Sequence, residues 1–293
     1  MNAIMNAAGT WMWNNRTHGE LKWTTIETEH FNIHYHQNLD KIAIQGASIA
    51  EQIRPTLMKQ MGLESLPTLD IIFTAEDEVL NGFAVPANYT IIWVDQNDAA
   101  LWTGDEKWLR TVLAHELQHL VYFNTVKGPW WLPEPMNSLV HGTPAWIVEG
   151  IAEYFTEEWR PFRYELSHRY HVLRNTVHKI QDPHNDGYSK SLYLADRFGD
   201  STISKILNHR NKFKFLDFKE SFKKHTGITL KQFNEDWRRQ MNTFYFSQRS
   251  QKERLEDAGV IRKLPIKRVL SFDYFSDTSR VAMITRSVSY THL

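Results

Sequence analysis

The stretch Ala114-His115-Glu116-Leu117-Gln118-His119-Leu120 decides how the rest of the chain is interpreted. Apolar residues recur within it and on both sides of it at helical spacing, which predicts a helix that packs on a core. On a helix, His115 and His119 lie one turn apart on the same face, so their imidazoles can converge on one metal ion. Glu116 lies about 100° further round, within reach of a metal-bound water. The spacing predicts zinc-assisted hydrolysis, with Glu116 as general base and one further protein ligand.

The composition limits which ligands and partners are possible. The chain has 293 residues with 34 basic and 34 acidic side chains, a balance that argues against a dedicated nucleic-acid-binding protein. Cysteine is absent, so a metal site must use histidine and carboxylate ligands. No apolar run approaches the ~18–20 residues of a membrane span. Residues 1–13 lack the basic and apolar regions of a signal peptide, so the location stays open, and an extracytoplasmic location is the expectation for the intact precursor.

The first hundred residues predict an α/β subdomain built on a twisted sheet. A helix capped by Asn38-Leu39-Asp40 is expected to run to about Gly62, with Pro55 inside it, and a turn is expected at Asn81-Gly82. His34 and His36 are expected to be solvated on the polar face of the first strand. The predicted strands are 31–36, 69–73 and 89–94.

The second half of the chain is predicted to be mainly helical up to about residue 245. The motif helix is expected over 105–124, followed by a Pro- and Gly-rich loop over 127–145 that is long enough to suggest a function. Further helices are predicted at 145–155, 163–180, 189–198, 201–209, 215–225 and 229–245. Two short strands, 269–275 and 281–284, then predict the start of a β domain.

Glu149 is the candidate for the third metal ligand. A five-residue motif recurs by chance in a chain with 14 histidines, so a third ligand in a suitable context is decisive. Glu149 lies in the apolar segment Trp146-Ile147-Val148-Glu149-Gly150-Ile151-Ala152-Glu153-Tyr154, where an unpaired carboxylate is costly to bury and a cation removes that cost. Gly150 inside a helix costs about 1 kcal/mol against Ala, which suggests close approach of another backbone. An exposed Glu149 on an amphipathic helix is the alternative, and the rival ligands are His141, Glu134 and Glu153.

The pattern W-x-x-E-G-x-A-E-Y resembles the second zinc-binding segment of gluzincin metallopeptidases, notably their aminopeptidase branch. The resemblance implies one Zn²⁺ held by His115, His119 and Glu149, with Glu153 fixing the tautomer of His115 from the second shell of ligands. The metzincin pattern fails, because it needs Gly at position 122 and His at position 125, where the chain has Tyr and Thr.

A donor for the developing oxyanion is also expected. The segment Gly187-Tyr188-Ser189-Lys190-Ser191 resembles the region after the zinc site in the same superfamily, where a Tyr shortly before a packed helix supplies a phenol. The resemblance assigns this role to Tyr188, as a second catalytic residue beside Glu116. Tyr193 and His184 are the rivals, and an ordinary surface Tyr188 is the alternative.

The order of these motifs resembles peptidase-MA-like gluzincin domains over about residues 22–245. The resemblance implies an α+β, zincin-like fold with a sheet subdomain at 22–104 and a helical subdomain at 105–245. Residues 1–21 are expected to be an irregular lead-in and 246–266 a linker. Such domains are often followed by a WD-type β-propeller, so 267–293 are expected to begin an incomplete β domain with an artefactual tail.

The expected activity is zinc-dependent hydrolysis of peptide bonds in a peptide or protein substrate. An endopeptidase is favoured over an aminopeptidase, because residues 82–88 lack the Glu with which the aminopeptidase branch reads a free amine. Strand 89–94 is expected to bind an extended peptide along its edge. The alternative is a metal-binding but weakly active interaction module attached to a propeller.

Overall fold

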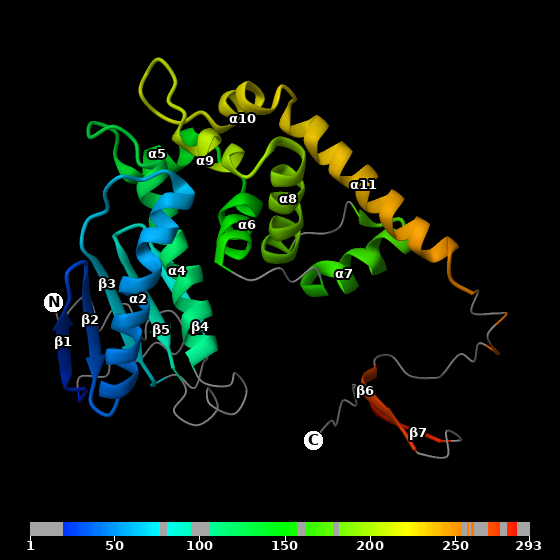
Figure 1. The fold of residues 1–293 in the computed structure, drawn as a ribbon, viewed down its shortest axis with the longest axis horizontal. Helices are drawn as coiled ribbons and strands as arrows, with labels where there is room; N and C mark the ends of the chain where they lie inside the picture. The colour runs from blue at the N-terminus through cyan, green and yellow to red at the C-terminus, as the bar shows by residue number, and fades with distance from the viewer. Residues whose placement is uncertain are drawn as a thin grey trace, which may run out of the picture. The chain divides into compact units, whose positions relative to one another are not determined.

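The computed structural model describes residues 20–76, 81–94, 106–156, 162–177, 182–253, 257, 259–260, 269–275 and 280–285. Contacts divide the chain into two units, Met1–Phe246 and Ser247–Leu293. The first unit carries a five-stranded sheet followed by a mainly helical region, which is a mixed α+β architecture (Figure 1). Almost all of the expected lead-in, and residues 286–293 with the expected tail, lie outside the described residues.

The sheet runs in the order β1-β2-β3-β5-β4. Strands β2, β3 and β5 are parallel to one another, whereas β1 and β4 are antiparallel to their neighbours at the two edges. The five strands are β1 (Trp23–Glu27), β2 (Phe31–His36), β3 (Leu69–Thr74), β4 (Asn81–Val85) and β5 (Tyr89–Trp93). The predicted strands therefore form, and two edge strands, β1 and β4, join them.

Strand β4 corrects two predictions. Asn81 and Gly82 are the first residues of β4 and not a turn, because they pair with Trp93 and Ile92 of β5. The turn lies instead at residues 86–88, where Asn88 takes a positive φ of 66°. Strand β5 lies between β3 and β4, so the predicted peptide-binding edge at 89–94 is wrong, and β4 is the edge strand on this side among the described residues.

The prediction that His34 and His36 are solvated is also wrong. Only 4% of His34 and 2% of His36 is exposed, because β2 lies inside the sheet and is buried on both faces. His34 lies between the Thr25 hydroxyl, 2.8 Å from its Nδ1, and Asp70 Oδ1, 3.2 Å from its Nε2. His36 Nε2 accepts a hydrogen bond from the Ala75 backbone N–H. Both are satisfied core histidines.

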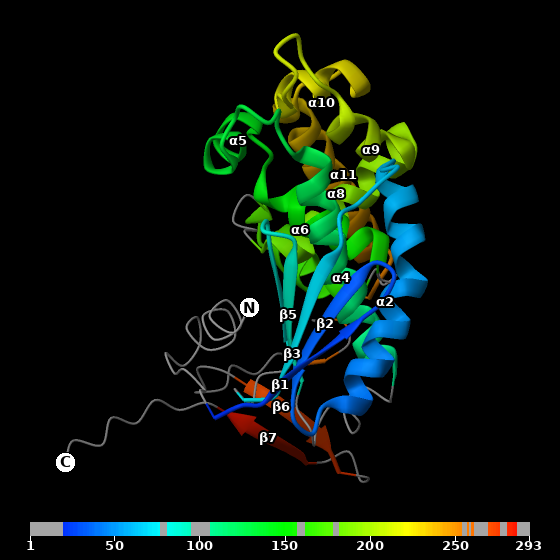
Figure 2. The same cartoon turned by 90° about the vertical axis from the view of Figure 1, so that its left-hand side faces the viewer.

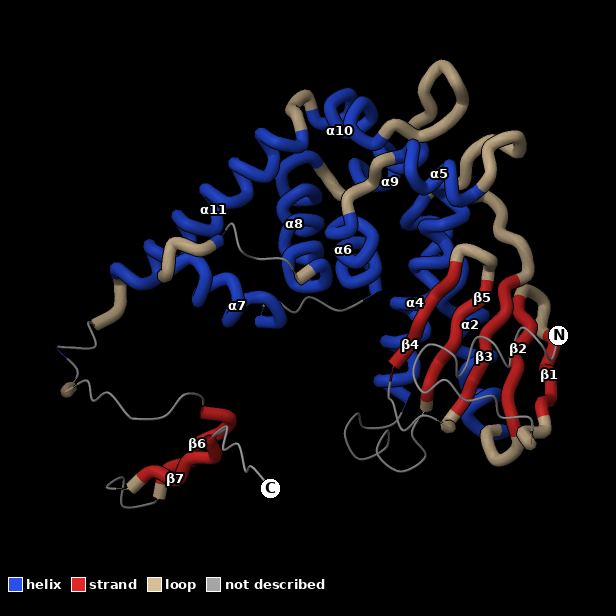
Figure 3. Tube along the Cα trace, turned by 180° about the vertical axis from the view of Figure 1, so that it is seen from behind, coloured by secondary structure: helices blue, strands red, loops and turns tan. Residues whose placement is uncertain are grey.

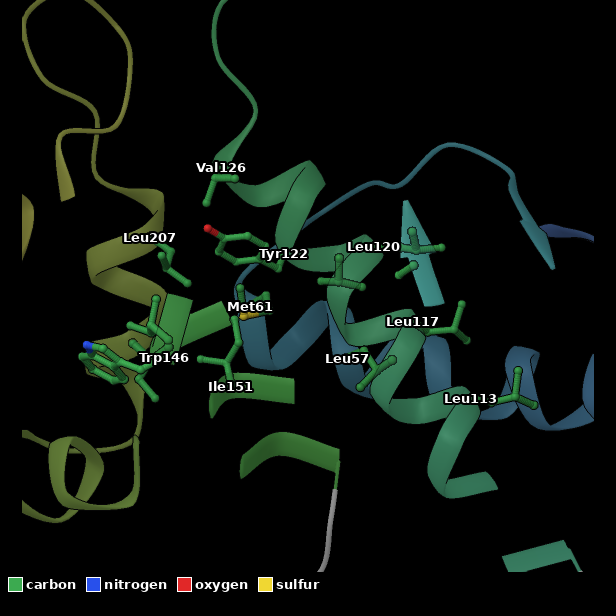
Figure 4. Packing of buried hydrophobic residues seen from close by; sticks show 14 of the residues in the cluster. Leu57, Met61, Leu113, Leu117, Leu120, Tyr122, Val126, Trp146, Ile151 and Leu207 are labelled. Carbon is green, nitrogen blue, oxygen red and sulfur yellow. The ribbon is translucent and has the colours of Figure 1, made fainter. Parts of the chain in front are cut away.

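Helices α2 (Asp40–Met61) and α4 (Glu106–Val126) cover one face of the sheet (Figures 1, 2 and 3). The predicted end of α2 at Gly62 is confirmed, with φ at 70°, and Pro55 lies within the helix without ending it. Figure 4 shows apolar residues of α4 packed beside α2 and α6 (Ala145–Thr156). The labelled residues of these three helices are Leu113, Leu117, Leu120, Tyr122 and Val126, Leu57 and Met61, and Trp146 and Ile151. This packing fixes the face of α4 that carries the histidines.

The helical half differs from prediction at several helix ends. Its other helices are α5 (Glu134–His141), α7 (Phe162–Leu173), α8 (Pro183–Phe198), α9 (Ser201–Asn208), α10 (Phe218–Thr226) and α11 (Leu230–Ser250). Helix α5 lies inside the predicted loop. Helix α8 begins six residues before the predicted start, at Pro183, because Asp182 caps it by accepting from the His184 N–H. Helix α11 continues through Ser250, so the first residues of the predicted linker are helical.

The second unit contains the two predicted strands. β6 (Val269–Tyr274) and β7 (Val281–Thr285) form an antiparallel hairpin, with an irregularity between Val269 and Ser271. Every residue of β6 is exposed. None of the helices in the described ranges is both long enough and apolar enough to span a membrane.

Candidate metal centre

Three helices bring the candidate site together. Helix α4 carries His115, Glu116 and His119, and α6 carries Glu149 and Glu153. Helix α6 packs against α4 on one side and against α8 on the other (Figure 1). The segments that supply the histidines and the carboxylates, about 30 residues apart in the chain, therefore meet at one point.

His115, His119 and Glu149 form a compact triangle of ligand atoms. The two Nε2 atoms lie 3.2 Å apart, and Glu149 Oε2 lies 3.6 Å from Nε2 of His115 and 3.3 Å from Nε2 of His119. Ligand atoms held 2.0–2.1 Å from a tetrahedral Zn²⁺ are separated from one another by about 3.3 Å. Two nitrogens and one carboxylate oxygen at these separations fit a zinc ion, and this donor set is known from catalytic zinc sites.

The charges at the triangle favour an ionised Glu149. Burial alone raises the pKa of this carboxyl, but hydrogen bonds from His115 and His119 outweigh burial and hold its pKa far below the usual range. Burial lowers the pKa of His115, and its contacts with Glu149 and neighbouring carboxylates raise it to a net value above normal. The Glu149 carboxylate therefore stabilises positive charge beside it, as it would stabilise a bound cation.

Glu116 lies next to the triangle in a confined position. Only 5% of the residue is exposed, and burial raises the pKa of its carboxyl above the ordinary value. The backbone of β4 passes close to it, because a Cβ added at Gly82 would lie 2.4 Å from Glu116 Cγ and 2.7 Å from Oε1. A carboxylate with a raised pKa in a water-poor site is suited to take up a proton.

His184 joins the site from the first turn of α8. Its Nδ1 lies 2.9 Å from Glu153 Oε1 and donates a hydrogen bond to that carboxylate, which raises the pKa of His184. His184, His115 and Glu149 also bring one ligand atom each within 4.8 Å of one another. Glu153 Oε1 is 3.9 Å from His115 Nδ1, which is beyond hydrogen-bond distance, so Glu153 orients His184 more directly than His115.

The other candidate oxyanion donors and metal ligands make contacts outside the triangle of His115, His119 and Glu149. Tyr188 lies inside α8, is 2% exposed and packs its ring against Tyr164. Tyr193 accepts a hydrogen bond from Arg197 on the same helix. His141 ends α5 and is bonded to Thr143. The Glu134 side chain lies outside the described part of the structure.

The sequence motifs predict His184 only as a rival oxyanion donor. The start of α8, which sets the position of His184, is signalled in the sequence by Asp182-Pro183. Asp182 is the N-cap residue and Pro183 occupies the first helical position. Starting α8 there puts His184 in the first turn. It also puts Tyr188 inside the helix, one turn later on the same side.

Two glycines set the distance between α6 and α8. A Cβ added at Gly150 would lie 2.4 Å from the backbone oxygen of Gly187, and one added at Gly187 would lie 2.2 Å from the backbone oxygen of Trp146. Backbone atoms cannot swing aside as a side chain can. The close backbone approach expected from Gly150 is thus present, and it holds Glu149 and Glu153 beside His184.

We expect the substitution Gly150→Ala to weaken metal binding. The new methyl group pushes α8 away from α6, which should lower zinc affinity by about 10–100-fold, the range seen when partners of metal ligands are lost. It should also destabilise the fold by about 1–3 kcal/mol, although Ala is the better helix former by about 1 kcal/mol. Competition with a fluorescent zinc chelator and urea unfolding measure the two effects.

Gly259→Ala is the matched control, because an added Cβ there meets nothing within 4 Å. A Gly150→Ala protein that is more stable than the parent and binds zinc equally well would show that the helix contact does not support the site.

Comparisons with known proteins give distant structural neighbours only. No protein-family model matches the chain, and no curated protein matches it. Among solved structures, the chain is similar to an aminopeptidase N family protein from Idiomarina loihiensis, with 15% identity and a TM-score of 0.46. The alignment covers 75% of this chain and 46% of the other, so this chain spans less than half the length of that protein.

Proposed function

We propose that the protein is a zinc-dependent peptidase of the gluzincin type with a zincin-like fold. The observation that carries the proposal is the triangle formed by His115, His119 and Glu149, with the buried carboxylate of Glu116 beside it. A bound Zn²⁺ would polarise the scissile carbonyl and lower the pKa of a water molecule.

Glu116 acts as the general base in this proposal. Its carboxylate accepts a proton from the attacking water and transfers that proton to the leaving amine. The raised pKa of Glu116 suits both steps, because a stronger carboxylate base takes the proton more readily and its acid form persists long enough to protonate the amine. In the zinc-free protein, the Glu116 carboxyl should therefore ionise above the usual pH range of a glutamate.

The oxyanion of the tetrahedral intermediate needs a hydrogen-bond donor, and α8 offers two. His184 stands at the metal centre, with Nδ1 bonded to Glu153 and Nε2 left to donate when the ring is protonated. The raised pKa of His184 favours that protonated form. Tyr188 lies one turn further on and is buried against Tyr164. We therefore place His184 first and Tyr188 second for this role.

An extended substrate can pair with the open edge of β4. This strand lies at the end of the sheet, and its Gly82 is in contact with Glu116, so a peptide added along β4 passes the general base. Main-chain pairing does not depend on a free amino terminus. Together with the lack of an acidic residue in 82–88, this supports cleavage within a chain over removal of single N-terminal residues.

We expect Glu116→Gln to separate metal binding from catalysis. The amide cannot accept the water proton, so peptide hydrolysis should fall by about 10²–10⁴-fold while one equivalent of zinc is retained. Glu149→Gln, by contrast, should lose zinc and activity together, because it removes a ligand charge. Elemental analysis and digestion of a mixed peptide library, with and without chelator, give both readouts.

A Glu116→Gln protein that cleaves as fast as the parent would overturn the mechanism. A parent protein that binds zinc stoichiometrically but gives no chelator-sensitive cleavage would instead favour the interaction module. Absence of stoichiometric zinc would contradict both the zinc peptidase and the metal-binding interaction module.

Substitutions on α8 distinguish the two donor candidates. We expect His184→Ala to lower kcat by about 10²–10³-fold with little change in KM, because the interaction forms only in the transition state. Tyr188→Phe should leave kcat close to the parent value. The kinetics should be measured on proteins with equal zinc occupancy. A large loss of kcat in Tyr188→Phe and none in His184→Ala would assign the donor role to Tyr188.

We also expect Gly82→Ala to impair the general base without releasing the metal. The added methyl group would overlap the Glu116 side chain, which must then leave its position, whereas the three ligands are untouched. Activity should fall by at least about tenfold at unchanged zinc content. Val85→Ala is the control on the same strand, and unchanged activity in Gly82→Ala would mean that Glu116 does not work from this position.

A further inference from the structure

Two loops of the first unit expose large aromatic side chains. The tryptophan loop, residues 127–133, follows α4, and 96% of its Trp130 and 52% of its Trp131 is exposed. The phenylalanine loop, residues 209–216, lies between α9 and α10, and 58% of its Phe213 is exposed. Tryptophan is highly buried on average in folded proteins, so two neighbouring exposed tryptophans indicate a surface that a binding partner covers.

Local hydrogen bonds hold the two tryptophans at the tip of their loop. The Leu132 N–H donates to the Pro129 carbonyl oxygen at 2.9 Å, which closes a tight turn with the two tryptophans at its central positions. Asn137 of α5 fixes the base of the loop, because its Nδ2 donates to the Val126 carbonyl oxygen at 3.1 Å. The exposure of both rings is therefore a property of a structured turn.

The phenylalanine loop presents Phe213 in a similar way. The Asn211 side-chain Oδ1 accepts from the Phe213 N–H at 2.9 Å. The Asn211 backbone donates to the Phe215 carbonyl oxygen and accepts from the Lys214 N–H. The rings of Phe213 and Phe215 are stacked, with their centres 6.1 Å apart. Figure 1 shows this loop projecting between α9 and α10.

A hydrogen bond joins the two loops at their bases. The Arg210 guanidinium donates to the backbone oxygen of Thr125, which lies in the last turn of α4, two residues before the tryptophan loop. Figures 1 and 2 show both loops at the same end of the first unit. One partner can therefore contact the exposed rings of both loops.

Both loops are basic. Lys127 in the tryptophan loop, and Lys212 and Lys214 in the phenylalanine loop, are exposed, and neither loop contains Asp or Glu. The Lys and Arg ion pairs among the described residues involve other side chains. The nearest acidic residues in the sequence are Glu134 and Asp217, and Asp217 caps α10. The loops thus carry positive charge in a chain whose basic and acidic residues balance.

The combination of aromatic rings and lysines favours an anionic bilayer as the partner. Tryptophan rings lie at the headgroup level of membranes, where the apolar ring is buried and the indole N–H stays hydrated. Lysines are attracted to anionic headgroups, whereas lysine is depleted in protein–protein interfaces. The balanced charge of the whole chain argues against a nucleic acid, the other ligand that attracts both aromatic and basic residues.

We propose that the two loops dock this protein on a membrane surface that contains anionic phospholipids. Trp130, Trp131 and Phe213 enter the interfacial region of the bilayer, and the three lysines contact the acidic headgroups. The contact is peripheral, because only loop tips take part. The inference does not depend on the metal centre, since none of these residues is a candidate zinc ligand.

Sedimentation of the full chain with lipid vesicles tests the proposal. We expect saturable binding to phosphatidylcholine vesicles that contain about 30% phosphatidylserine, and binding at least about tenfold weaker to pure phosphatidylcholine. Added sodium chloride should weaken the binding, because salt screens the lysines. No binding to the anionic vesicles, equal binding to both kinds of vesicle, or binding to a single-stranded oligonucleotide in preference to vesicles would each overturn the proposal.

Substitution of the tryptophans tests the role of the rings. We expect Trp130→Ser/Trp131→Ser to weaken binding to the anionic vesicles by at least about tenfold, because two interfacial rings are lost. Phe244→Ser is the control, at an exposed aromatic residue of α11, and should bind like the parent. All the substituted side chains are exposed, so thermal unfolding of both variants should match that of the parent.

Substitution of the lysines tests the role of charge. We expect Lys212→Gln/Lys214→Gln to weaken binding to the anionic vesicles by about tenfold, because each lysine near an anionic surface contributes to the attraction. The salt dependence of binding should also become shallower. Unchanged affinity in both the tryptophan and the lysine double variants would contradict the assignment of the two loops.

Lys22→Gln/Lys41→Gln is the matched control, because it removes the same charge from exposed residues elsewhere in the first unit. Lys41 lies in the first turn of α2, whereas Asn208, next to the phenylalanine loop, bonds to Met61 in the last turn. This variant should keep the affinity of the parent. An equal loss of affinity in the control would show that the overall charge of the chain, and not the loops, attracts the vesicles.

Discussion

The position of one carboxylate, Glu149 between two imidazoles, is the constraint on which the candidate centre depends. An ion in the apolar surroundings of α6 needs polar groups or a cation against it, and the imidazoles of His115 and His119 approach the Glu149 carboxylate at 3.6 and 3.3 Å. The contact requires α4 and α6 to pack side by side. The core residues in Figure 4 achieve this by filling the space between α2, α4 and α6. The energetics of the core and the chemistry of the site are therefore linked through the placement of α6.

The sequence predicts the architecture well where periodicity and end signals agree. The helix that ends at Gly62, the strands near 31–36, 69–73 and 89–94, and the helical second half all follow from such patterns. The errors arise where tertiary structure overrides a local signal. Asn81-Gly82 is a strong turn signal, yet pairing with β5 draws it into a strand. The alternation that suggests solvated His34 and His36 is uninformative in a strand that is buried on both faces.

The candidate centre is only partly predictable from the sequence, because only some of its contacts lie within one helix. Two imidazoles at i and i+4 are a local property of one helix, so His115 and His119 can be paired without knowledge of the fold. The partners of Glu153 depend on where α8 begins and on how closely α8 approaches α6. The sequence motif around Glu149 and Glu153 does not reveal either of these. The glycine contact between Gly150 and Gly187 sets that approach, and it brings His184 beside Glu153.

The nearness of Gly82 to Glu116 has a consequence for the reactivity of this carboxylate. The strand itself leaves no room for water on the side of the carboxylate that faces it, because even one added carbon at Gly82 would overlap the Glu116 side chain. Poor hydration makes the ionised form of Glu116 less stable and a stronger base, because fewer solvent hydrogen bonds must be broken when it takes a proton. In the proposed peptidase, the backbone of β4 would thus keep the general base reactive by shielding it from water, before any substrate binds.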